Sequence, residues 1–202
     1  MQLFVDWDGT VTVQDSLVQV IHEFGDPALL AELEPRVGVD LTLHEEIAAE
    51  FAAISAPLED VVGWVLANVE VRPGLAELAE LRPVIVSAGF HELIEPVLRR
   101  EGIELEVLAN RVEARADGWR VSFRDESACA SCGEPCKRAG VAGSPYAYVG
   151  DGYSDRCAAL AADRIFARDS LARHLDELGV PYVPFEDLAD VATLVRGTAL
   201  DG

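Results

Sequence analysis

The sequence FVDWDGT, residues 4–10, places two aspartates directly after a short apolar run. The run at residues 2–5 is typical of a buried parallel strand. Carboxylates at Asp6 and Asp8 are costly to bury there unless they hold a cation or take part in a reaction. Gly9 permits an unusual turn or a close approach to a ligand. The stretch predicts a reactive or cation-binding loop, with a purely structural turn as the alternative.

Two later strands are predicted to end in the same way. The apolar residues 83–86 precede Ser87, and the run at residues 146–149 leads to Asp151. In open α/β sheets, ligands bind outside the carboxyl ends of the strands. We therefore expect Asp6, Ser87 and Asp151 to converge, although they are far apart in the sequence.

The remaining pattern alternates strands and helices. Residues 16–69 have apolar side chains at helical spacing, and Thr42 with Glu45 forms a capping box. Residues 105–123 alternate apolar and polar side chains around Asp117-Gly118, which indicates a hairpin. The chain is predicted to have an α/β fold: a Rossmann-like parallel sheet flanked by helices, with a small helical insertion after the first strand and a β-hairpin excursion.

Composition narrows the classes of partner. The chain has 202 residues, 50% of them hydrophobic, enough for one compact domain or for a core with a modest insertion. Its apolar stretches are far too short to span a membrane, and MQLFVD does not resemble a signal peptide, so a cytoplasmic location is expected. The net charge of −20, with 36 acidic and 16 basic residues, argues against a nucleic-acid partner.

Three further features point to a phosphate group. The hydroxyl of Ser87 and the amides of Ala88 and Gly89 are expected at a helix N-terminus, a position that suits an anion, although serines cap many helices. Lys137 offers a point charge for phosphate, with solvated surface as the alternative. Asp155 follows Asp151 at the start of a helix, where it would also be a favourable helix charge.

Together, DWDGT (residues 6–10), Ser87, Lys137 and GDGYSD (residues 150–155) resemble the four motifs of the haloacid dehalogenase-like phosphatase superfamily. The motifs occur in the order of that family and span nearly the whole chain. The set is far more specific than any one of its members.

The resemblance implies a mechanism that begins at the first motif. Asp6 would be the nucleophile that attacks phosphorus, and Asp8 would protonate the leaving alcohol and then activate water. Mg²⁺ would be bound by the Asp6 carboxylate, the Asp8 backbone carbonyl and Asp151. A cation is needed because an anionic carboxylate must approach an anionic phosphate.

The same resemblance implies the phosphate-binding and supporting residues. Ser87, Ala88, Gly89 and Lys137 would bind the phosphoryl oxygens. Thr10 and Asp155 would support the metal site or the lysine.

The insertion resembles the small helical cap of the phosphoserine phosphatase-like branch. This implies a core at residues 1–13 and 72–202 and a cap at residues 14–71. Finer similarity is to a subgroup that includes the 2-hydroxy-3-keto-5-methylthiopentenyl-1-phosphate phosphatases of methionine salvage. The expected partner is a small phosphorylated metabolite, with phosphoserine or another phosphorylated amine as the alternative substrate, and the expected state is a monomer or a homodimer.

Five residues of the cap and rim are candidates for reading the substrate. Each has a surface or capping role as its alternative. The candidates are Asp15, His22, Glu23, Arg72 and His91, and Asp15 is the first choice because it closely follows the catalytic loop.

Three cysteines form the pattern Cys129-x-x-Cys132-x-x-x-Cys136. Structural zinc would need another ligand, such as His91 or Cys157. A reversible disulfide and reduced thiols are the alternatives. Because Cys136 adjoins Lys137, chemistry at this cluster would affect the phosphate site.

Three functional classes remain in view. An Mg²⁺-dependent phosphatase is favoured because no acid of the motifs is substituted. A phosphotransferase would use the same carboxylates with a different acceptor, and a phosphometabolite-binding regulatory protein is the nonenzymatic alternative.

Overall fold

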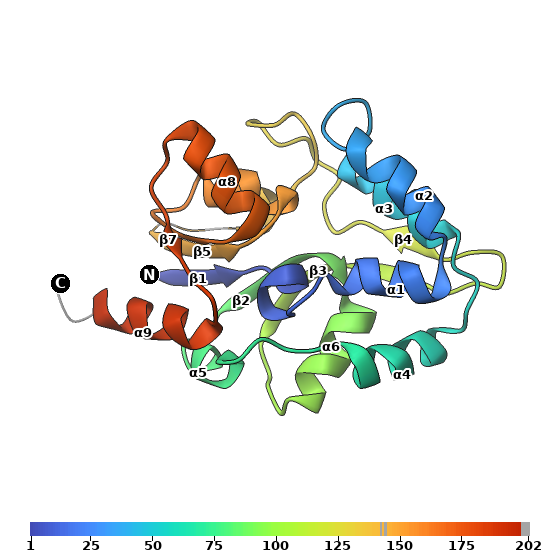
Figure 1. The fold of residues 1–202 in the computed structure, drawn as a ribbon, viewed down its shortest axis with the longest axis horizontal. Coiled ribbons are helices and arrows are strands. Elements are labelled where there is room, and N and C mark those ends of the chain that lie inside the picture. Colours follow the sequence, from blue (N-terminus) through green and yellow to red (C-terminus); the bar gives the residue numbers. More distant parts are fainter. Residues whose placement is uncertain (142, 144, 199–202) are drawn as a thin grey trace.

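A computed structural model describes residues 1–141, 143 and 145–198 of the chain. Its centre is a seven-stranded sheet with the order β4-β3-β2-β1-β5-β6-β7 (Figure 1). Every neighbouring pair is parallel except β3 and β4, which are antiparallel. The strands are β1 (Gln2–Val5), β2 (Val84–Phe90), β3 (Glu106–Glu113), β4 (Arg120–Ser122), β5 (Tyr146–Gly150), β6 (Arg164–Ala167) and β7 (Val183–Pro184).

Helices flank this sheet and also fill the insertion after β1. The helices of the insertion are α1 (Ser16–Phe24), α2 (Pro27–Leu33), α3 (Leu43–Ala52) and α4 (Leu58–Asn68). The others are α5 (Leu75–Ala79), α6 (His91–Arg100), α7 (Arg156–Ala159), α8 (Asp169–Leu178) and α9 (Leu188–Thr198). No helix in the described part of the chain has the length and apolar character needed to cross a membrane. The predicted α/β fold is confirmed.

The two faces of the sheet have separate apolar cores. In β1, Leu3 and Val5 belong to the larger core, and Phe4 belongs to the smaller one. This alternation follows from the period of two in a strand. The larger core is covered by α4, α5, α6 and α9, while α7 and α8 cover the smaller one (Figure 1). The central strand is therefore buried on both faces, as its apolar sequence predicted.

The hairpin predicted around Asp117-Gly118 is confirmed, with β3 and β4 paired from Arg111 with Ser122 to Glu113 with Arg120. β3 is also a strand of the main sheet, because its first half pairs in parallel with β2. The antiparallel part of the sheet is therefore limited to the second half of β3, the turn and β4.

The hairpin is joined to the helical insertion. The backbone N–H of Trp119 donates to the carbonyl of Ile54 at 3.0 Å, and its indole N–H donates to the carbonyl of Ala56 at 2.8 Å. The Phe51 ring of α3 lies 4.6 Å from the Phe90 ring and 6.1 Å from the Trp119 ring, between centroids. The capping box of Thr42 and Glu45 fixes the start of the same helix. These contacts set the position of α3 over the sheet.

We expect Phe51→Ala to lower the free energy of unfolding by about 3–5 kcal/mol, because it removes a fully buried ring that links insertion and core. Urea unfolding followed by circular dichroism measures this change. Val39→Ala, at a side chain 82% exposed, is the control and should leave the transition in place. Equal midpoints for both variants would contradict the role given to this contact.

Candidate active site

Three strands bring the predicted site residues to one edge of the sheet. β1 lies between β2 and β5, so Asp6, Ser87 and Asp151 come together at neighbouring strand ends. One detail differs from the prediction. β2 continues to Phe90 with an irregular register, and α6 begins only at His91, so Ser87 lies in the strand and not in the first turn of a helix.

Asp6 is buried and held by two donors. Its Oδ1 accepts from the backbone N–H of Trp7 at 2.6 Å and from the ammonium of Lys137. Burial and the nearby Asp155 raise the pKa of Asp6 well above its usual range, and Lys137 acts against this rise. The ionised form of Asp6 is therefore stabilised by the positive charge of Lys137.

Asp155 holds the lysine in place. Its Oδ1 accepts from Lys137 Nζ and from the Tyr148 hydroxyl, each at 2.8 Å. Its Oδ2 accepts from the backbone N–H groups of Asp151 at 3.0 Å and Gly152 at 2.9 Å. Burial lowers the pKa of Lys137, but Asp155 and Asp6 outweigh this and hold it above its usual range. The lysine is therefore positively charged within the buried site.

Asp8 lies beside the nucleophile candidate with different partners. Its Oδ1 accepts from the backbone N–H of Ser16 at 3.1 Å and from the Ser16 hydroxyl, and its Oδ2 accepts from Ser87 Oγ at 3.3 Å. Burial raises the pKa of Asp8, and the Ser16 hydrogen bonds oppose the rise. A carboxyl group with a raised pKa can hold a proton close to neutral pH, which suits an acid–base role.

Asp151 completes a group of carboxylates that fits a cation. Oxygens of Asp6, Asp151 and Asp155 lie within 4.8 Å of one another. The Thr10 hydroxyl donates to Asp151 at 2.8 Å, while burial and Asp155 raise the pKa of Asp151 to about 6. Both oxygens of Asp155 already accept two hydrogen bonds each, so Asp6 and Asp151 are the members with capacity for a metal. Oxygen ligands of this kind suit Mg²⁺.

Gly9 is required for this close approach. Its φ of 77° lies in the left-handed region, and an added Cβ would come within 2.4 Å of an Asp151 oxygen. Any other residue would push the Asp8 loop away from β5.

Arg72 has a different place from the one predicted. It is buried, and its guanidinium donates to the carbonyls of Thr10 at 2.9 Å and Gly9 at 2.8 Å. It also donates to the backbone carbonyl of Glu186 at 3.2 Å. The residue therefore braces the backbone of the catalytic loop and does not face the pocket, so its prediction as a substrate reader is corrected.

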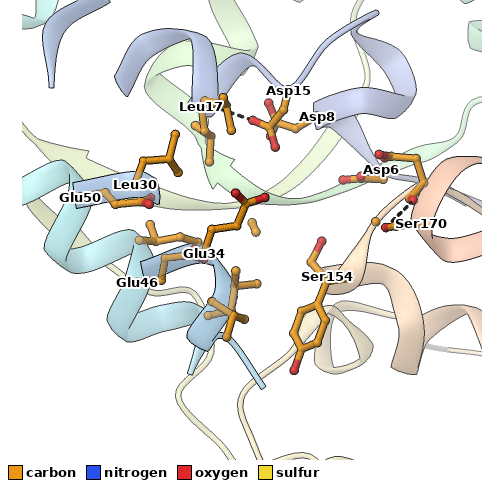
Figure 2. A pocket seen from close by; sticks show the side chains of 18 of the residues that line it. Asp6, Asp8, Asp15, Leu17, Leu30, Glu34, Glu46, Glu50, Ser154 and Ser170 are labelled. Atoms are coloured by element: carbon orange, nitrogen blue, oxygen red, sulfur yellow. Dashed lines mark hydrogen bonds between the residues drawn. The ribbon is translucent and has the colours of Figure 1, made fainter. Parts of the chain in front are cut away.

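A cleft of about 490 Å³ opens from these carboxylates toward the helical insertion. Figure 2 shows Asp6 on one side and Glu34, Glu46 and Glu50 on the opposite side, with Asp8 between them. Its apolar wall comes from the insertion: Leu17, Val18, Ile21, Leu30, Val37, Leu43 and Ile47.

Among the predicted substrate readers, Asp15 does line this cleft. It also caps α1 through a hydrogen bond from Val18 N–H at 3.0 Å, so both of its expected roles are present in the geometry. His22 and Glu23 are exposed on α1, and His91 contacts Glu95 at 2.9 Å. None of these three side chains lines the cleft, so its geometry gives no support to their predicted role as substrate readers.

Sequence reasoning missed the acidic residues of α3. Burial raises the pKa of Glu46 to about 7 and, with Glu46 nearby, that of Glu50 to about 8. Oε1 of Glu50 is buried and has no hydrogen-bond partner among the described residues. The available signal was position: both glutamates adjoin Ile47 and Phe51 on the inward face of the helix. Ser16, the partner of Asp8, gave no comparable signal.

Comparison with known proteins places this geometry in context. The bifunctional enzyme MtnB/MtnX of Bacillus licheniformis is 27% identical over 213 residues, and the match covers 98% of this chain but 49% of that protein, so the chain spans about half of its length. A 2-hydroxy-3-keto-5-methylthiopentenyl-1-phosphate phosphatase of Microcystis aeruginosa is 29% identical over 94% of both chains. A solved phospho-aspartyl intermediate analogue of phosphoserine phosphatase shares the fold, with a TM-score of 0.70, 17% identity and coverage of 96% of this chain and 97% of that one.

The resemblance drawn from the ordered motifs is confirmed by a family-wide comparison. The family model for haloacid dehalogenase-like hydrolases matches residues 3–160, which include Asp6, Ser87, Lys137 and Asp155. This chain therefore belongs to the haloacid dehalogenase-like hydrolase family.

Proposed function

We propose that the chain is an Mg²⁺-dependent phosphatase that hydrolyses a small phosphate monoester through an aspartyl-phosphate on Asp6. The observation that carries this proposal is the pairing of two buried carboxyl groups with different partners. Asp6 is held by Lys137, and Asp8 is held by Ser16 and Ser87, at the base of one cleft. The name of the Microcystis aeruginosa relative, which is a phosphatase, supports the same reaction.

The residues divide the reaction between them. A carboxylate oxygen of Asp6 attacks phosphorus while Asp8 gives its proton to the leaving oxygen. Lys137 offsets the charge of the phosphoryl oxygens, and the Ser87 hydroxyl orients them through a hydrogen bond. Asp8, now ionised, then takes a proton from the water that attacks the aspartyl-phosphate, which restores Asp6.

The carboxylates also define the proposed metal site. Asp6 and Asp151, with the backbone carbonyl of Asp8, would hold Mg²⁺, which supplies the positive charge that lets a carboxylate approach a phosphate. Asp155 and Thr10 orient Lys137 and Asp151 through the hydrogen bonds already described. We further propose that residues 14–71 act as a cap that excludes water from the cleft.

Two substrate classes have support. The apolar wall of the cleft and the names of the relatives favour the methylthiopentenyl phosphate ester. The alternative, a phosphorylated amine, is favoured by Glu50, because its buried and unpartnered oxygen requires a hydrogen-bond donor. A substrate ammonium group would supply that donor and would also offset the charges of Glu34 and Glu46.

Asp6→Asn should abolish phosphate release from every ester that the wild type hydrolyses, because an amide cannot replace the attacking carboxylate. Phosphate release is measured with phosphoserine, phosphoethanolamine, an aryl phosphate and the methionine-salvage ester, with Mg²⁺, with EDTA, and with Mg²⁺ restored after EDTA. Asp60→Asn, at an exposed site on α4, is the control. Undiminished turnover in the Asp6 variant, or in EDTA, would refute the mechanism.

Asp8→Asn should slow hydrolysis of an alkyl phosphate by about 10²–10⁴-fold, because the leaving oxygen is no longer protonated. An aryl phosphate needs little protonation to leave. With that substrate, rapid-quench kinetics should show a burst of the aryl alcohol followed by slow turnover, as the aspartyl-phosphate waits for its base. A uniform loss of rate for both esters, without a burst, would exclude this division of roles.

The pH dependence separates the two substrate classes. If Glu50 and Glu46 bind an ammonium group, the ratio of kcat/KM for an aminoalkyl phosphate to that for a neutral alkyl phosphate should rise with pH. This increase in the ratio should occur between about pH 6 and about pH 9, as these carboxyl groups ionise. Glu50→Gln should flatten the ratio, whereas Glu32→Gln, exposed on α2, should not.

The same variant has an effect on stability with a defined sign. The folded state raises the pKa of Glu50 from 4.5 to about 8, so it binds a proton that the unfolded chain releases, and stability is lost as pH rises through this range. Glu50→Gln should therefore raise Tm more at about pH 8 than at about pH 5. An equal change in Tm at both values would show that Glu50 is not buried as described.

A further inference from the structure

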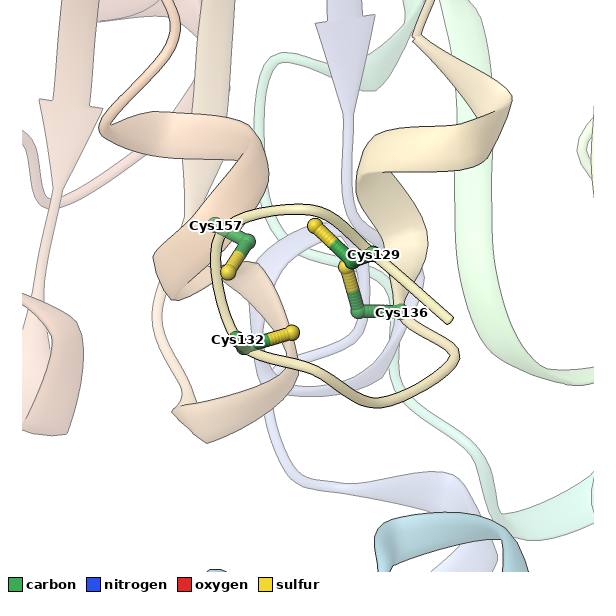
Figure 3. Close-up of side chains that lie close together, drawn as sticks. All are labelled: Cys129, Cys132, Cys136 and Cys157. Atoms are coloured by element: carbon green, nitrogen blue, oxygen red, sulfur yellow. The ribbon is translucent and has the colours of Figure 1, made fainter. Parts of the chain in front are cut away.

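We propose that the four cysteines of this chain bind one structural Zn²⁺ ion, which joins the loop before Lys137 to helix α7. The sequence pattern left the fourth ligand open between His91 and Cys157. The structure brings Cys157 to Cys129, Cys132 and Cys136, and their sulfur atoms all lie within 4.8 Å of one another (Figure 3).

The spacing of the sulfur atoms fits a tetrahedral metal. Zinc binds thiolate sulfur at about 2.3 Å, which separates the sulfur atoms of a tetrahedral site by about 3.8 Å. Figure 3 shows three cysteines on one loop and Cys157 on the facing helix, with the side chains directed toward one another. All four cysteines are free thiols in the structure. A set of four thiolates is typical of zinc and differs from the oxygen ligands proposed for Mg²⁺.

The backbone around Cys129 is arranged to support a sulfur ligand. The N–H of Ser131 points to Cys129 Sγ at 3.4 Å, and the N–H of Gly133 donates to the Cys129 carbonyl at 2.8 Å. Gly133 has a φ of 79°, which allows the chain to turn back directly after Cys132. Hydrogen bonds of this kind from outside the ligand set orient metal ligands and stabilise their charge.

Packing of neutral thiols does not account for the cluster as well. Within the described residues, neither apolar core includes any of the four cysteines, and Cys132 is exposed. Residues 123–136 form a long loop with no helix or strand between β4 and Lys137. Loops longer than about 12–15 residues without structure of their own are uncommon in compact domains, and this loop is at that limit. A metal ion would fix this loop to the rest of the fold. Arg138 and Arg156, which are close to the ligands in the chain, would offset the net negative charge of four thiolates bound to one Zn²⁺.

The site has a consequence for the phosphate-binding lysine, and this part rests on the proposed function. Cys136 directly precedes Lys137, and Cys157 follows Asp155 by two residues. Lys137 and Asp155 are bonded at 2.8 Å. Zinc would therefore fix both segments that bear this ion pair, so it positions Lys137 without touching the substrate.

Metal content tests the site without reference to activity. The 202-residue chain, purified in reductant without chelator, should contain about one zinc ion per chain, as measured by inductively coupled plasma mass spectrometry. Cys132→Ser and Cys157→Ser should lose this zinc, and Ser131→Ala on the same loop should keep it. Because serine variants can misfold, Co²⁺ is also added to wild-type protein freed of zinc. We expect thiolate-to-cobalt charge-transfer bands and tetrahedral d–d bands in the absorption spectrum. These bands should disappear when Zn²⁺ is added and displaces the Co²⁺.

Several results would overturn the proposal. One is wild-type protein without zinc, whose four thiols all react at once with a thiol reagent under native conditions. Another is a disulfide among these cysteines, seen as a mass change on reduction. Iron in place of zinc, with its visible absorption, would assign the ligands to a different metal.

The positioning role is tested by removing zinc and then restoring Mg²⁺ alone. We expect kcat/KM for the best phosphate ester to fall, by up to about 100-fold, mainly through KM, and to recover when zinc is added. Unchanged kinetics would refute the positioning role. Zinc binding without hydrolysis of any ester would contradict the proposed function only, whereas hydrolysis by protein that never binds zinc would contradict the zinc site only.

Discussion

The buried ion pairs of Lys137 with Asp6 and Asp155 are the interaction on which the rest of the site depends. A buried carboxylate is unfavourable alone, and removing one partner of such a pair destabilises a protein by about 3–5 kcal/mol. Here the ammonium group of Lys137 pairs with two carboxylates. Asp6 directly follows β1, and Asp155 lies in the turn after β5. The ion pairs therefore link side chains that follow β1 and β5, the neighbouring strands at which the strand order reverses.

The site has more negative charge than this lysine can neutralise. Burial raises the pKa of Asp6, Asp8 and Asp151, and repulsion from Asp155 adds to the rise in pKa at Asp6 and Asp151, in a chain whose net charge is −20. A site of this kind gains stability from any cation or proton that it binds. In the proposed function, this excess charge would favour binding of a metal ion and a proton on Asp8, and an anionic phosphate would bind only with added positive charge.

The active-site loop is fixed mainly from behind. Arg72 binds the backbone carbonyls of Gly9 and Thr10, and the close contact of Gly9 with Asp151 leaves no room for a side chain at position 9. The proposed zinc site would restrain the Lys137 side in the same way. Under the proposed function, specificity would come from the helical insertion, whose glutamates and apolar side chains form the outer wall of the cleft. In that proposal, the reacting residues and the residues that select the substrate lie on separate parts of the fold.

The sequence by itself determined the parallel sheet and the residues at its reactive edge. Apolar runs that end in Asp6, Ser87 and Asp151 bring these three side chains together once their strands are neighbours, and the hairpin and the capping box of α3 follow from local patterns. Only the tertiary structure decided which distant side chains meet. Arg72 and His91 have the chemistry of substrate-binding residues, but their orientation turns them away, whereas Glu50 and Cys157 are brought in by packing. The physical reason is that periodicity fixes the face on which a residue lies, while its partners depend on how separate elements pack against one another.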